Sequence, residues 1–130
     1  FLPYVMAAMC AKKQKWNDAV VLNTSGRICD TTIANIFIVK NEIIYTPSLD
    51  EGCIAGVMRK NIINRLIENN VLVNEAKLSV EELLNADEVF LTNSIYDIQW
   101  VQNIGDKIYT NNYIRKINSM VLQKTLGNDC

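Results

Sequence analysis

The chain has 130 residues, of which 49% are apolar and 21% are charged, a composition typical of one soluble globular domain rather than a disordered or fibrous chain. Its 13 basic and 14 acidic residues leave a formal net charge of −1, so it offers no excess of positive charge for binding nucleic acid or an anionic membrane. No apolar run reaches the roughly 18 to 20 residues of a membrane span, and the absence of histidine and of any CxxC pair argues against a metal site.

The first half of the chain alternates between helix and strand signals. Residues 2–13 place apolar side chains on one helical face, with a proline in the first turn, and are predicted to form a helix. Short apolar and β-branched runs at residues 19–22, 36–39 and 43–45, separated by turn residues, predict antiparallel strands in a meander. From Gly56 the apolar spacing changes to that of a helix, which is expected to end near residue 69.

The second half continues the mixture of strands and helices. Ser79 followed by Glu82 has the capping-box form, which predicts the start of a short helix. The other elements expected are strands at residues 71–74, 88–92 and 98–101, a turn at 105–106 and a helix at 113–126. Intermingled strands and helices predict a single domain over residues 1–130, of the α/β or α+β class, with a mixed, largely antiparallel sheet and flanking helices.

Three loops hold polar residues that the neighbouring periodic patterns do not require. In one of them the predicted helix begins at Gly56, so the free backbone N–H groups of Gly56, Val57 and Met58 point toward one place. Such a helix start binds phosphate through its N–H groups and its dipole, although an ordinary strand-to-helix turn gives the same pattern. The three loops are residues 29–35, 52–59 and 92–97.

Two charged residues in these loops each have a structural interpretation beside a functional one. Arg59 falls in the first helical turn, where the helix dipole disfavours a cation, so we expect either a carboxylate partner or a ligand. Asp30 follows a strand-like run and precedes two threonines, where it could cap a turn. The four cysteines are expected to be reduced and mostly buried, in a cytoplasmic protein.

Six blocks of sequence occur in one order: Asp18-Ala-Val-Val-Leu-Asn23, Gly26-Arg-Ile-Cys-Asp30, Ala34-Asn-Ile-Phe-Ile-Val39, Tyr45-Thr-Pro-Ser-Leu49, Gly56-Val-Met-Arg59 and Leu83-Leu-Asn-Ala-Asp-Glu-Val-Phe-Leu-Thr-Asn-Ser94. In order and spacing they resemble the C-terminal domain of the class-IV (fold-type IV) pyridoxal-phosphate aminotransferase and 4-amino-4-deoxychorismate lyase family. The resemblance covers nearly the whole chain. It implies that the chain is the C-terminal, cofactor-binding domain of a longer two-domain enzyme.

The resemblance also implies roles for particular residues. The lysine that would hold pyridoxal 5'-phosphate lies upstream of Phe1, so the N-terminal domain and this catalytic residue are expected outside the sequence. Asp30 matches the acidic residue that pairs with the pyridinium nitrogen, usually a glutamate in relatives. The remaining matches are Gly56, Val57, Met58 and Ser94 at the phosphate, Phe1 beside the ring, and Thr31 and Thr32 on the substrate side.

Within the family, two blocks favour the lyase. Ala34-Asn35 and Gly56-Val-Met-Arg59 are closer to the lyase pattern than to that of the aminotransferases. The predicted reaction is elimination of pyruvate from 4-amino-4-deoxychorismate, which gives 4-aminobenzoate, in an enzyme expected to be a homodimer. The alternatives are a branched-chain or D-amino-acid aminotransferase and, for the chain by itself, a non-catalytic structural or binding domain.

Overall fold

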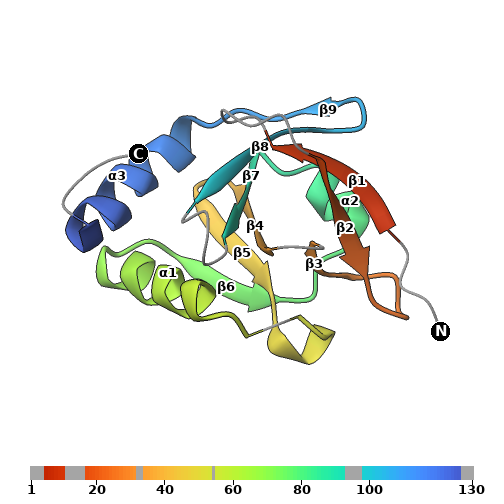
Figure 1. Cartoon of the computed structure of the whole chain (residues 1–130), viewed down its shortest axis with the longest axis horizontal. Helices are drawn as coiled ribbons and strands as arrows, with labels where there is room; N and C mark the ends of the chain where they lie inside the picture. Colours follow the sequence, from red (N-terminus) through yellow and green to blue (C-terminus); the bar gives the residue numbers. More distant parts are fainter. Residues whose placement is uncertain (1–4, 11–16, 32–33, 54, 93–97, 127–130) are drawn as a thin grey trace.

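The computed structural model describes residues 5–10, 17–31, 34–53, 55–92 and 98–126, with side chains described between residues 20 and 119. Within these ranges, nine strands, three α-helices and one 3-10 helix (η1) follow one another (Figure 1). In chain order they are β1 Val5–Cys10, β2 Asn17–Leu22, β3 Ile28–Thr31, β4 Asn35–Lys40, β5 Ile43–Pro47, η1 Leu49–Glu51, α1 Val57–Glu68, β6 Val73–Ala76, α2 Val80–Leu84, β7 Glu88–Thr92, β8 Gln99–Ile104, β9 Lys107–Ile108 and α3 Asn112–Leu126.

The strands form one mixed sheet in the order β3-β2-β1-β8-β7-β4-β5-β6, with β9 paired to β8. Every pairing is antiparallel except the parallel pair of β5 and β6. The sheet curls, because β3 at one end of this order also lies against β4 and β5. The prediction of a mixed, largely antiparallel sheet with flanking helices is confirmed. The curl brings β3 close to β4 and β5, although these strands lie far from β3 in the strand order.

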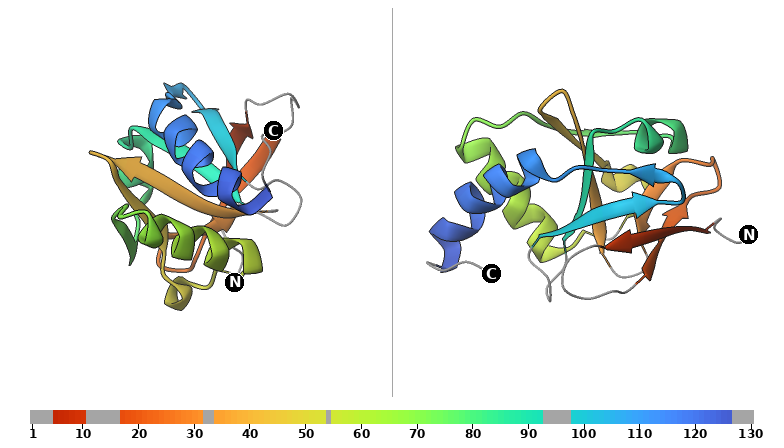
Figure 2. Two further views of the ribbon diagram at one scale, coloured as in Figure 1. Left: turned by 90° about the vertical axis from the view of Figure 1, so that its left-hand side faces the viewer. Right: turned by 90° about the horizontal axis from the view of Figure 1, so that it is seen from above.

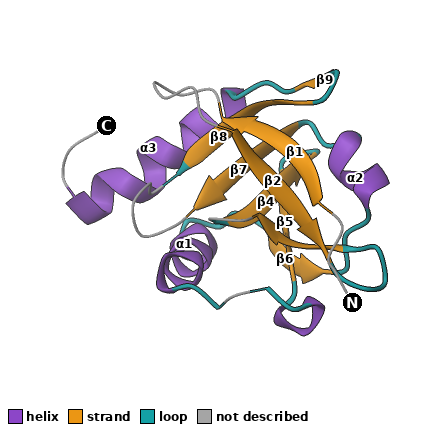
Figure 3. Cartoon of the chain, turned by 45° about the vertical axis from the view of Figure 1, so that its right-hand side comes forward, coloured by secondary structure: helices purple, strands orange, loops and turns teal. Residues whose placement is uncertain are grey.

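Two apolar clusters lie on the two faces of the sheet, since alternate residues of a strand point to opposite faces. One face carries Ile36 and Ile38 and is covered by α2. The other carries Phe37 and Val39 and is covered by α1 and α3, which lie side by side in Figure 2 and opposite α2 in Figure 3. On this second face the rings of Phe37 and Phe90 stack with centroids 4.8 Å apart.

The prediction of a helix over residues 2–13 is wrong. The described part of this segment is the strand β1, which pairs with β2 in the register Val5↔Val21 and with β8 on its other side. All six of its residues are apolar, and such a run is compatible with either a helix or an interior strand. The segment is a strand because it pairs with both β2 and β8, and a local sequence pattern does not reveal such partners.

The predicted meander is only partly correct. The hairpin of β4 and β5 is confirmed, but β2 pairs with β1 and β3 rather than with β4. The strand expected at residues 71–74 begins later, at Val73, because Asn70 has a positive φ of 63° and the Val71 amide still donates to Leu66 at the end of α1.

The other predicted elements are confirmed within a few residues. The capping box is present, with the Glu82 amide donating to Ser79 Oγ and the Ser79 amide donating to Glu82 Oε1. In the part of the chain that the structure describes, no helix has both the length and the apolar character that crossing a bilayer requires.

Candidate functional site

The centre of the site lies where β3 meets β4. Asp30 on β3 and Asn35 at the start of β4 are both buried, with 8% and 7% of their surfaces exposed. At the end of β3 the Thr31 amide and hydroxyl both donate to the carbonyl of Ala34, the residue before β4, at 2.9 Å. The Asn35 side chain lies beside Asp30, and Asn35 Nδ2 donates to Asp30 Oδ1 at 2.8 Å.

The first turn of α1 approaches the oxygen of the Asn35 side-chain amide, whose nitrogen is hydrogen-bonded to Asp30. Gly56 is the N-terminal cap residue of this helix and has no side chain with which to accept from the first-turn N–H groups. A Cβ atom at Gly56 would lie 2.8 Å from Asn35 Oδ1. The buried carboxylate of Asp30 and the N-terminus of α1 are thus separated by one amide side chain.

Arg59 anchors this helix start. Its side chain is buried, and its Nη2 donates to the Pro47 carbonyl at 3.1 Å and to Glu75 Oε1 at 2.9 Å. The expected carboxylate partner is therefore confirmed, and the contacts fix α1 to the ends of β5 and β6. Arg59 Nε is buried and has no hydrogen-bond partner among the described residues.

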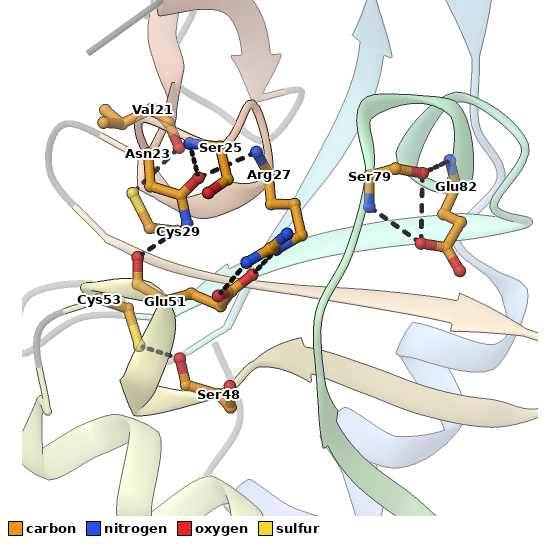
Figure 4. A network of polar contacts seen from close by, with 10 residues as sticks. All are labelled: Val21, Asn23, Ser25, Arg27, Cys29, Ser48, Glu51, Cys53, Ser79 and Glu82. Atoms are coloured by element: carbon orange, nitrogen blue, oxygen red, sulfur yellow. Dashed lines mark hydrogen bonds and ion pairs between the residues drawn. The ribbon is translucent and has the colours of Figure 1, made fainter. Parts of the chain in front are cut away.

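A second ion pair holds the segment that leads into the helix (Figure 4). Glu51 in η1 is buried and accepts from the Arg27 guanidinium, through Nε and through Nη2, the latter at 3.2 Å. Asn23 links the same elements, because its Nδ2 donates to the Glu51 carbonyl while its Oδ1 accepts from the amides of Ser25 and Arg27. The turn between β2 and β3 therefore braces η1, from which the chain runs to Gly56.

Two cysteines lie near the contacts between Arg27, Asn23 and Glu51 (Figure 4). Cys29 is buried and donates to the Val21 carbonyl at 3.3 Å, and Cys53 donates to the Ser48 carbonyl at 3.5 Å (Figure 4). Both are free, as predicted. Burial raises the pKa of both thiols, which favours the neutral thiol form.

Two polar residues at this place were given no individual binding role in the sequence prediction, although they lie in the loops 29–35 and 92–97 that it singled out. Asn35 is one, and Thr92 at the end of β7 is the other. Thr92 lies directly across from Asn35 in the β4–β7 register, so the two side chains share the face toward α1. Thr92 is fully buried and its Oγ1 has no partner among the described residues. The available signal was a polar residue at the end of an otherwise apolar strand.

The predicted site residues are distributed as follows. Asp30 and Gly56 come together through Asn35, and Val57 and Met58 are the first two residues of α1. The hydroxyl of Thr31 is engaged with the backbone carbonyl and amide of Ala34. Phe1, Thr32 and Ser94 lie outside the described residues.

Comparison with known proteins identifies the family. Residues 1–104 match the model of amino-transferase class IV. The chain belongs to this family. The aminodeoxychorismate lyase of Vibrio harveyi is 39% identical over 88 residues, which are 68% of this chain and 32% of that protein. Branched-chain-amino-acid aminotransferase 6 of Arabidopsis thaliana is 34% identical over 106 residues, 80% of this chain and 30% of that protein.

Solved structures of the family share the fold. The branched-chain aminotransferase of Thermoproteus uzoniensis, solved with norvaline, matches with a TM-score of 0.80 and 28% identity over 85% of this chain and 37% of that one. An aminotransferase from Brucella abortus, solved with its cofactor PLP, matches with a TM-score of 0.79 and 22% identity, over 85% of this chain and 40% of that one. The chain spans about a third of the length of the relatives named above.

The Arg27–Glu51 ion pair should make the stability of the fold depend on pH in acid. Hydrogen bonding to Arg27 lowers the pKa of Glu51 below its ordinary value of 4.5, so the pair stabilises the fold above that pH and the stabilisation is lost as the pH falls through the lowered pKa. We expect Glu51→Gln to lower the melting temperature near neutral pH and to flatten its decline between about pH 5 and pH 3. Glu68→Gln, at an exposed position on α1, is the control. An unchanged acid profile in Glu51→Gln would contradict this account.

Proposed function

We propose that the chain is the cofactor-binding C-terminal domain of a longer pyridoxal-phosphate enzyme, and that Asp30 and the N-terminus of α1 bind the two ends of the cofactor. The observation that carries this proposal is their convergence. A buried carboxylate and an uncapped helix start lie on either side of Asn35. Pyridoxal phosphate has a ring nitrogen that a carboxylate can pair with and a phosphate that a helix N-terminus can bind.

The proposed phosphate-binding end of the site has a suitable set of hydrogen-bond donors. The first-turn N–H groups of α1 receive no side-chain cap from Gly56, and the helix dipole favours an anion there. The hydroxyl of Thr92 is a buried donor without a partner among the described residues, on the same sheet face as Asn35. Because a buried hydroxyl ordinarily finds a partner, a phosphate oxygen would satisfy it.

The Asp30 carboxylate lies at the proposed ring-binding end of the site. Asp30 keeps its carboxylate oriented through the hydrogen bond from Asn35, and its burial restricts access of water. In that position it would hold a proton on the pyridine nitrogen. When bound, pyridoxal phosphate supplies an electron sink for the carbanion of the substrate. The residues of this chain orient the cofactor, while proton transfer at the substrate falls to the lysine expected upstream of Phe1.

For the reaction we favour pyruvate elimination from 4-amino-4-deoxychorismate, which leaves 4-aminobenzoate. The support is the pair of sequence blocks Ala34-Asn35 and Gly56-Val-Met-Arg59 and the likeness to the Vibrio harveyi lyase. Transamination of a branched-chain or D-amino acid is the second candidate, supported by the likeness to the Arabidopsis thaliana aminotransferase. Both reactions begin with the same cofactor and a small amino-group substrate.

The choice of reaction is tested on the full-length protein with two assays. One measures release of 4-aminobenzoate and pyruvate from 4-amino-4-deoxychorismate, and the other measures amino transfer from leucine or D-alanine to a 2-oxo acid. We expect the first reaction to dominate. Transfer without elimination would overturn the lyase proposal and leave the cofactor site intact. The 130-residue chain alone is expected to be inactive in both assays, because no lysine within it matches the cofactor lysine of the family.

The role of Asp30 is tested by two substitutions. Asp30→Asn keeps the shape and can still accept from Asn35, but it removes the charge, so we expect a loss of about ten- to a hundredfold in rate with the cofactor still bound. Asp30→Glu is expected to be tolerated, since relatives usually carry glutamate. A turn-capping role predicts the reverse, because asparagine caps nearly as well as aspartate. A fully active, equally stable Asp30→Asn protein would remove Asp30 from the site.

Thr92 and Thr46, both almost fully buried, form a matched pair for testing the phosphate end of the proposed site. Thr92→Val removes a hydroxyl without a described partner, so we expect the melting temperature to hold or rise while affinity for pyridoxal phosphate and for inorganic phosphate falls about tenfold. Thr46→Val removes a hydroxyl that donates to the Ile36 carbonyl at 2.7 Å, so it should lower stability and leave affinity unchanged. Unchanged phosphate affinity in Thr92→Val would exclude this hydroxyl from the site.

A further inference from the structure

The side-chain amide of Asn35 is constrained at both ends. Its Nδ2 donates to Asp30 Oδ1 at 2.8 Å, and since a carboxylate only accepts, the nitrogen must be the atom on that side. Its Oδ1 then faces Gly56, 2.8 Å from where a Cβ atom would stand. The backbone of Asn35 is held as well, because it pairs with Thr92 in the sheet. The amide therefore has little freedom to turn or retreat.

Backbone conformation does not explain the glycine at position 56. Gly56 has φ −70° and ψ 149°, an extended conformation that any residue adopts. The requirement is instead steric, since a contact of 2.8 Å is closer than side-chain carbons tolerate and the atom it would meet is the fixed Asn35 Oδ1. A side chain at position 56 would displace either the start of α1 or the amide that holds Asp30.

We propose that Asn35 is a positioning residue that sets the Asp30 carboxylate relative to the first turn of α1, and that position 56 is glycine to leave room for its amide. The ligand-dependent part rests on the proposed function, in which these two features bind opposite ends of one cofactor. Asn35 then fixes the spacing between the ring partner and the phosphate donors without being a catalytic residue.

The steric part is tested by a double-mutant cycle in the full-length protein. Gly56→Ala is expected to lower the melting temperature by about 3–8 °C, because it forces a methyl group against Asn35. In the Asn35→Ala background the same substitution should change the melting temperature by no more than about 1 °C, since the opposing oxygen is gone. Asn61→Ala, at an exposed position on α1, is the control background, and in it Gly56→Ala should keep its full effect.

The positioning part is tested by ligand affinity, with pyridoxal phosphate and inorganic phosphate as separate probes. Asn35→Ala should lower the affinity for pyridoxal phosphate about tenfold and leave the affinity for inorganic phosphate unchanged, because only the ring partner, Asp30, loses its orientation. Gly56→Ala should lower the affinity for both ligands. The double variant should recover the affinity for inorganic phosphate while that for pyridoxal phosphate stays low.

These measurements separate the inference from the proposed function. Additive losses of melting temperature in the cycle would overturn the steric claim, whatever the ligand. Equal losses for both probes in Asn35→Ala, or no loss for either, would overturn the positioning claim. If the wild-type protein binds neither probe, the proposed function fails, and with it the positioning claim, while the thermal cycle still decides why position 56 is glycine.

Discussion

The hydrogen bond from Asn35 to Asp30 is the interaction on which the site depends. It joins β3, at one end of the strand order, to β4, which lies near the other end, and it is made where the curl of the sheet places β3 against β4. The hydrogen bond from the Thr31 amide to the Ala34 carbonyl holds the end of β3 against the start of β4.

Ion pairs outside the centre fix the two segments that converge on it. Glu51 and Arg27 hold η1 against the turn between β2 and β3, and Arg59 holds the first turn of α1 against β5 and β6. In both pairs one partner is buried, at Glu51 and at Arg59, so loss of the opposite charge would leave a desolvated ion. Such contacts are therefore a means of fixing geometry, and they keep the Asn35 amide and Gly56 within contact distance.

The sequence predicted those elements whose signals are local. The helix that begins at Gly56, the capping box at Ser79 and the hairpin of β4 and β5 each follow from residues within a few positions of one another. The strand β1 was predicted as a helix because its six apolar residues fit either element until its neighbours β2 and β8 are known. The resemblance to class-IV enzymes selected Asp30 and Gly56, but the approach of Asn35 to Gly56 joins segments far apart in the chain, which no local pattern contains.

If one ligand engages both sides of the Asn35 amide, NMR titration of the protein with pyridoxal phosphate should show both sides responding to it. We predict that the backbone amides of Gly56, Val57 and Met58 and the side-chain amide of Asn35 shift together and saturate with one dissociation constant. The hollow of about 280 Å³ between α2 and the strands β4 and β5, lined in part by Tyr45, Leu78 and Asn85, should be unaffected. Shifts confined to that hollow, or saturation at Gly56 with the Asn35 side chain unmoved, would contradict the account.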